Sequence, residues 1–134
     1  MYMLDTNILI YAISHPQNQL IDRIISEAVN GQVCISAITY GELEIGILKS
    51  RDPERNRLAI EAVLSGIPVL SYDSRAAAFY ARIRSMLEQA GRRVEDPDMM
   101  IAGHAASLDC ILVTNNTQHF ARMGIVLEDW LQNR

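Results

Sequence analysis

Short, continuously apolar runs alternate along the chain with longer segments whose apolar residues recur at helical spacing. Runs of this kind are expected for strands of a parallel sheet that is covered on both faces. Five of them are predicted as strands, at residues 2–4, 33–36, 68–71, 110–114 and 125–127. Because helical segments separate them, the pattern predicts an α/β fold with a central parallel sheet of four to five strands.

The segments between these runs carry the stripes and end signals of helices. Residues 19–30 place Leu20, Ile24 and Ala28 on one face, and Gly31 follows where a helix usually ends. Further helices are predicted from after Ser36 to about residue 49, after Pro53, over residues 73–90, and from Pro97 with Asp96 as the N-cap.

Length and composition indicate one globular domain spanning residues 1–134. The chain has 134 residues, of which 49% are hydrophobic and 21% charged, so it can bury a core without a structural metal. It has no apolar run of the roughly 18 residues that a membrane span needs and no signal-peptide pattern, so we expect a cytoplasmic protein that does not associate with membranes. The formal net charge of −4 argues against a nucleic-acid coat protein, but not against a nuclease whose acidic residues hold cations.

The two cysteines, Cys34 and Cys110, lie far apart in apolar segments. No Cys-X-X-Cys motif or Cys/His cluster accompanies them, so the sequence does not predict a structural zinc site. We expect both to be buried free thiols.

Acidic and polar residues fall at one edge of the predicted sheet. Asp5 directly follows the first strand, and Glu42 lies early in the helix after the second. Asp98 opens the helix that leads back into the fourth strand, which ends in Thr114 and Asn116. Sites in open parallel sheets lie outside the carboxyl ends of the strands. The sequence therefore predicts that these five residues converge there.

Three carboxylates close together repel one another unless a cation joins them. Oxygen ligands of this kind suit Mg²⁺ or Mn²⁺, which complete their coordination with water and substrate phosphate. Phosphodiester hydrolysis is commonly carried out by such sites. Each acid alone has an ordinary interpretation as a helix cap or a surface residue, so the hypothesis depends on their joint placement.

Several segments resemble the VapC-type toxins of the PIN-domain ribonuclease family. Residues 3–11 (MLDTNILIY) resemble the opening of these proteins, and residues 35–46 (ISAITYGELEIG) their second motif. Residues 98–105 and 113–120 resemble the third and fourth motifs, and the ending at residues 127–130 also fits. The resemblance covers essentially the whole chain, in order and with the expected spacing.

This resemblance implies an α/β/α sandwich and an Mg²⁺- or Mn²⁺-dependent endoribonuclease. Such a toxin cuts RNA, in tRNA or rRNA loops, inhibits translation and is neutralised by a VapB-type antitoxin; we also expect a homodimer. Asp5, Glu42 and Asp98 match the family's catalytic and metal-binding acids, and Thr114 its supporting hydroxyl. Asn116 and His119 stand where acids are common in relatives, so this chain lacks negative charge that would hold a second permanent ion. The predicted catalytic residues are Asp5, Glu42, Asp98, Thr114 and Asn116.

Two other functions remain open from the residues. A phosphatase-like hydrolase would use Asp5 as its nucleophile on a Rossmann-like sheet, but it needs a second acid where Asn7 stands and a lysine that we do not find. A non-catalytic PIN-like binding module would keep only the fold. The intact acids Asp5, Glu42 and Asp98 argue against that alternative.

The remaining histidines and basic residues give weaker signals. His104 lies six positions after Asp98, on another side of the helix, and is expected to be structural. The sequence is equally consistent with His119 at the edge of the site and with His119 on a helix surface. The densest basic stretch could contact either RNA or an antitoxin, and comprises Lys49, Arg51, Arg55 and Arg57.

Overall fold

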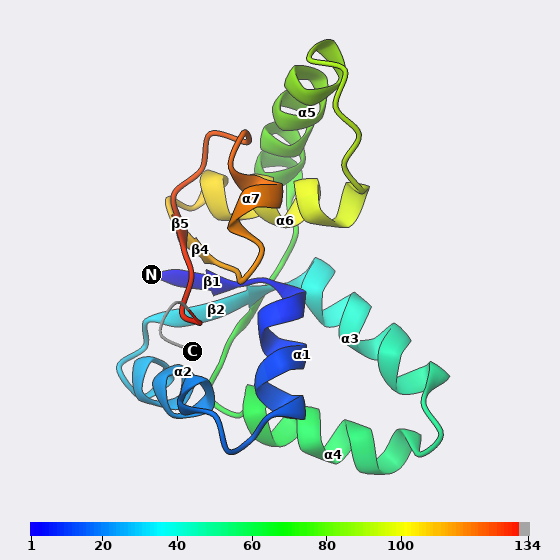
Figure 1. The fold of residues 1–134 in the computed structure, drawn as a ribbon, viewed down its shortest axis with the longest axis vertical. Coiled ribbons are helices and arrows are strands. Elements are labelled where there is room, and N and C mark those ends of the chain that lie inside the picture. Colours follow the sequence, from blue (N-terminus) through cyan, green and yellow to red (C-terminus); the bar gives the residue numbers. More distant parts are fainter. Residues whose placement is uncertain (132–134) are drawn as a thin grey trace.

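The computed structural model describes residues 1–131 and contains an all-parallel sheet in the order β3-β2-β1-β4-β5. The strands are β1 (Tyr2–Leu4), β2 (Val33–Ser36), β3 (Val69–Leu70), β4 (Ile111–Val113) and β5 (Leu127–Glu128). All five predicted strands are present, three of them shorter or shifted by one or two residues. The strand β1 lies at the centre of the sheet, between β2 and β4 (Figure 1).

Helices connect the strands. They are α1 (Thr6–Ser14), α2 (Gln19–Val29), α3 (Ala37–Lys49), α4 (Pro53–Leu64), α5 (Ser74–Gln89), α6 (Asp96–Ser107) and α7 (Thr117–Phe120). The hydrophobic periodicity gave no bounds for α1 or α7. Residues 8–13 of α1 are apolar on every side, so their periodicity cannot separate a helix from a strand, and α7 is a single turn.

The predicted N-cap of α6 was wrong by one residue. Asp96 is the first helical residue, and Glu95 occupies the cap position without a capping hydrogen bond from its side chain. Pro97 lies in the first turn, as expected, where its missing N–H costs nothing.

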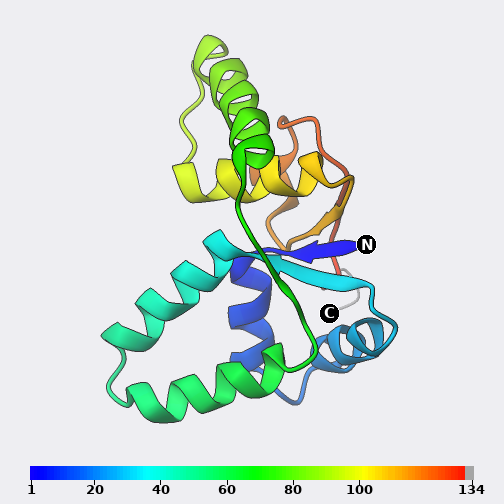
Figure 2. The ribbon, with the colours of Figure 1, turned by 180° about the vertical axis from the view of Figure 1, so that it is seen from behind.

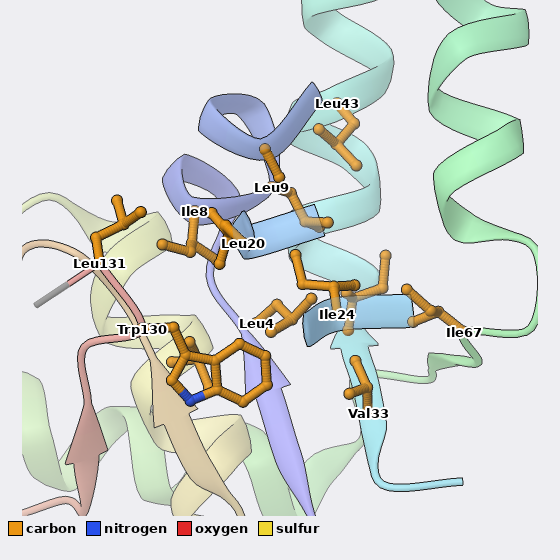
Figure 3. Close-up of a cluster of buried hydrophobic side chains, with 13 residues drawn as sticks. Leu4, Ile8, Leu9, Leu20, Ile24, Val33, Leu43, Ile67, Trp130 and Leu131 are labelled. Atoms are coloured by element: carbon orange, nitrogen blue, oxygen red, sulfur yellow. The ribbon is translucent and has the colours of Figure 1, made fainter. Parts of the chain in front are cut away.

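Helices cover both faces of the sheet, as expected for an α/β/α sandwich (Figures 1 and 2). A hydrophobic core lies on each face. Neighbouring residues of β1 divide between them: Leu4 packs with Ile8 and Ile24 on one face, and Met3 packs with Leu112 on the other. Figure 3 shows the first core, in which Leu4, Val33 and Trp130 come from distant parts of the chain. This alternation explains why the strands are apolar throughout.

The end of the described chain is held on this core by Trp130. Its ring meets Tyr2 edge to face, with centroids 5.1 Å apart, and the Arg23 guanidinium lies 4.2 Å from the indole centroid. The two cysteines, Cys34 and Cys110, are buried and free, as expected. Among the described residues, no helix has both the length and the apolar character to cross a membrane.

The helices α5 and α6 cross in close contact at Gly103. A Cβ atom at this glycine would lie 2.5 Å from the backbone nitrogen of Tyr80 and 2.8 Å from its Cα atom. Both obstructing atoms belong to the backbone, so a rotamer change cannot relieve the clash. Gly103 therefore sets how closely α6, which carries Asp98, approaches α5.

The variant Gly103→Ala should lower the free energy of unfolding by about 1–3 kcal/mol or more, because α5 must shift to admit the methyl group. Urea denaturation measures this loss. The matched control is Gly41→Ala in α3, where nothing lies within 4 Å of the added Cβ. That change should leave stability unaltered or raise it by about 0.5–1 kcal/mol. Equal stabilities for the two variants would contradict the close crossing.

Candidate active site

The carboxylate of Asp5 is buried where β1 ends and α1 begins. Its Oδ1 atom accepts a hydrogen bond from the backbone N–H of Ile8 at 2.8 Å, so it caps α1. The residue is only 3% exposed. Asp5 therefore both caps α1 and lies at the predicted edge of the sheet.

Burial raises the pKa of Asp5 from its ordinary value of 3.8 to about 6. Hydrogen bonds from the Thr114 hydroxyl and the Ile8 amide lower the pKa in part, whereas the charges of Asp98 and Glu42 raise it further. The structure thus brings the three acids close enough to interact electrically. A cation bound beside Asp5 would stabilise its ionised form.

Glu42 is held from the neighbouring helix. The Thr6 hydroxyl, in the first turn of α1, donates to Glu42 Oε1 at 2.6 Å and lies 3.1 Å from the Thr39 hydroxyl. Thr39 is fully buried and was not identified from the sequence. Its position three residues before Glu42, on the same side of α3, is the signal that would have found it.

Asp98 lies in the first turn of α6, where the helix dipole favours a negative charge. Its Oδ2 atom lies 2.8 Å from Nε2 of His119 on α7, and each side chain is 30% exposed. The sequence left His119 between the site edge and the helix surface. The structure places it in contact with a site carboxylate.

Thr114 and Asn116 differ in their surroundings. The Thr114 hydroxyl is buried, hydrogen-bonds to Asp5 and accepts from the backbone N–H of Asn116 at 3.0 Å. Asn116 is exposed at the start of α7, and within residues 1–131 its side chain makes no hydrogen bond to the carboxylates. A direct role of Asn116 stays a prediction.

The donor set fits a loosely held, water-rich ion. Over the described part of the chain, no three His, Cys, Asp or Glu side chains form a ready-made metal shell. A closed structural site would need such a shell, but Mg²⁺ is commonly held by one or two carboxylates together with water and substrate phosphate. Buried Asp5, with Asp98 and Glu42 near it, provides oxygen ligands of that kind.

His104 is structural, as expected, and links two elements of the site. It is buried, and its Nδ1 atom lies 2.8 Å from the Ser36 hydroxyl, which in turn caps α3 through the Ile38 N–H. Burial lowers the pKa of His104 and so favours the neutral imidazole. The contact joins α6, the helix of Asp98, to the start of α3, the helix of Glu42.

Two arginines on the surface are already paired with acidic residues. Arg57 makes two hydrogen bonds to Glu44, at 2.6 and 2.9 Å, and so ties α4 to α3. Arg84 is bonded to Glu88, Asp96 and Tyr80. Lys49, Arg51 and Arg55 are instead exposed around the turn that joins α3 to α4.

An apolar groove of about 190 Å³ lies beside Glu42, between α1, α3 and α4. Ile10 and Ile13 line it from α1, Ile47 from α3 and Ile60 from α4. Ile10 is 47% exposed, so the groove offers apolar surface to a partner next to an acidic side chain.

Comparison with known proteins places the chain in a family. The PIN domain model matches residues 2–126. A Shigella flexneri protein described as a tRNA(fMet)-specific endonuclease VapC is 45% identical over 130 residues, which cover 96% of this chain and 97% of that protein. A Rickettsia felis protein, Ribonuclease VapC2, is 35% identical over 130 residues, again with 96% and 97% coverage.

Solved structures agree with this assignment. The VapBC2 complex of Rickettsia felis, bound to a DNA fragment from its promoter, contains a chain with a TM-score of 0.90 and 34% identity, covering 96% of this chain and 98% of that one. DNA-bound VapBC from Salmonella typhimurium contains a chain with a TM-score of 0.90 and 42% identity, with 96% and 97% coverage. This chain therefore belongs to the PIN-domain family, among its VapC ribonucleases.

Proposed function

We propose that this protein is a metal-dependent endoribonuclease and the toxin of a type II toxin–antitoxin pair. The observation that carries the proposal is the meeting of Asp5, Glu42 and Asp98 at one edge of the sheet, with Asp5 buried and its pKa raised to about 6. RNA as the substrate follows from membership of the VapC ribonucleases. Such a toxin would meet its substrate in the cytoplasm.

Asp5 and Asp98 would hold the cation, Mg²⁺ or Mn²⁺, with Glu42 as a further ligand or as the group that orients water. When bound, the ion would supply a Lewis acid for the scissile phosphate and lower the pKa of an attacking water. The protein's own contribution is orientation. Ile8 N–H and Thr114 hold Asp5, and the Thr6 hydroxyl holds Glu42, so these carboxylates need little rearrangement during the reaction.

Charge counting suggests when a second ion would bind. Ionised Asp5, Glu42 and Asp98 carry three negative charges, whereas Asn116 is neutral. One divalent ion would leave a net charge of about −1, and two would leave about +1 in a partly buried site, which is unfavourable without an anion. A scissile phosphate would supply that anion, so a second ion would arrive with the RNA.

Transfer RNA is the substrate class that the comparisons favour, because relatives in Shigella and Salmonella are described as tRNA(fMet)-specific. A VapB-type antitoxin is the proposed inhibitor, since the similar solved structures are VapBC complexes. The groove beside Glu42 suits an amphipathic segment whose Arg or Lys side chain reaches the carboxylates in place of the cation. A homodimer remains our expectation for the quaternary structure.

Each of Asp5→Ala, Glu42→Ala and Asp98→Ala should lower Mg²⁺-dependent cleavage of tRNA by orders of magnitude, because each removes a carboxylate of the proposed site. The measurement is the cleavage rate on purified tRNA, with circular dichroism to verify folding. Asp22→Ala, an exposed acid on α2, is the matched control and should retain activity. A folded Asp5→Ala protein with undiminished cleavage would contradict the proposal.

The variant Asp5→Asn should make the metal-free protein more stable at neutral pH. The folded-state pKa of Asp5, about 6, lies above the ordinary value of 3.8, so the parent loses stability as pH rises from about 4 through 6. The asparagine keeps the cap acceptor but carries no charge. Urea denaturation in EDTA should give the variant a free energy of unfolding that exceeds that of the parent by at most about 3 kcal/mol at pH 7.5. The difference should be small at pH 4. A constant difference across this range would refute the assigned cause.

The double variant Glu42→Gln and Asp98→Asn should weaken binding of the cognate antitoxin, because a cationic side chain loses the charges with which it pairs. Isothermal titration with the purified antitoxin gives the affinity. Asp22→Asn controls for the loss of overall negative charge. Unchanged affinity in the double variant would mean that inhibition works away from the carboxylates.

A further inference from the structure

His119 contacts the site at one defined atom. Its Nε2 lies 2.8 Å from Oδ2 of Asp98, although the two residues belong to different helices. The next residue, Phe120, is buried and packs in the core beneath α6, and its ring meets the imidazole edge to face at 5.5 Å. Burial of Phe120 thus anchors the short helix α7 that presents His119.

Each carboxylate of the site has a hydrogen-bond donor from a different segment. Asp5 is held by Thr114, Glu42 by Thr6, and Asp98 by His119. The first two donors are hydroxyl groups, and the third is an imidazole N–H. Without His119, no described side chain donates to the carboxylate of Asp98. With His119 included, each of the three carboxylates accepts at least one hydrogen bond.

The contacts favour a supporting role over direct coordination. Within residues 1–131, the side chain of His119 forms a hydrogen bond to Asp98 and none to Asp5 or Glu42. An imidazole that donates through Nε2 occupies Oδ2 and leaves Oδ1 of Asp98 available. Metal-binding carboxylates are usually held by such outer partners, whose loss typically costs 10–100-fold in metal affinity.

We propose that His119 is a positioning residue that fixes the carboxylate of Asp98 for metal binding. This inference rests on the proposed function only in taking Asp98 as a metal ligand. An acid at this position would add a negative charge but would repel Asp98 in the metal-free state. Compared with a chain that carries an acid at position 119, this chain has less negative charge at the site, but the orientation of its Asp98 carboxylate is fixed.

The test is calorimetric titration of Mn²⁺ into the RNA-free protein at pH 8. His119→Ala should bind Mn²⁺ about 10–100-fold more weakly than the parent. His119→Gln should recover most of the affinity, because its amide N–H can take the place of Nε2–H. His15→Ala, at an exposed histidine next to α1, is the matched control and should bind like the parent.

Three outcomes would overturn the inference. In the first two, His119→Ala binds Mn²⁺ at least as tightly as the parent, or His119→Gln binds it no better than His119→Ala. In the third, the electron paramagnetic resonance of bound Mn²⁺ shows a strong ¹⁴N coupling that disappears in His119→Ala. The last would make His119 a direct ligand. Asp98→Ala separates this test from the proposed function. If Asp98→Ala binds Mn²⁺ normally, or the parent binds none, the metal assignment fails together with the inference.

Discussion

The burial of the Asp5 carboxylate is the constraint on which the rest of the site depends. The same side chain caps α1, ends the central strand and lies near two other acids, so its negative charge cannot move to solvent. Burial and the neighbouring charges both disfavour ionisation, and two hydrogen bonds only partly offset them. The surrounding structure therefore makes ionisation of Asp5 unfavourable, and a bound cation would offset this cost. Such a carboxylate suits metal-assisted hydrolysis.

The sheet topology supplies the other acids. The strand β1 lies between β2 and β4, and all three run in the same direction, so their carboxyl ends meet at one edge. Asp5 and Thr114 follow two of these strands directly, and Glu42 follows the third within α3. Asp98 arrives from the helix that precedes β4. Remote segments thus form one site without any long loop.

Contacts outside the site fix the distances within it. Gly103 lets α6 lie against the backbone of α5, and His104 joins α6 to the capping residue of α3 through Ser36. These contacts touch neither a proposed ligand nor a substrate. They nevertheless set where Asp98 and Glu42 stand relative to each other, because a helix moves largely as a rigid body. The packing of α6 therefore affects both the stability of the fold and the position of Asp98.

The sequence by itself determined the α/β class, the five strands and the edge at which the acids gather, because burial on two faces imposes continuous apolar runs and parallel strands share one carboxyl edge. It did not determine α1, whose apolar residues have no polar face, or the single turn α7. Only the tertiary structure paired His119 with Asp98, Arg57 with Glu44, and Gly103 with Tyr80. These contacts depend on how helices pack against one another, and hydrophobic periodicity specifies which face of a helix is buried but not which residue it will meet.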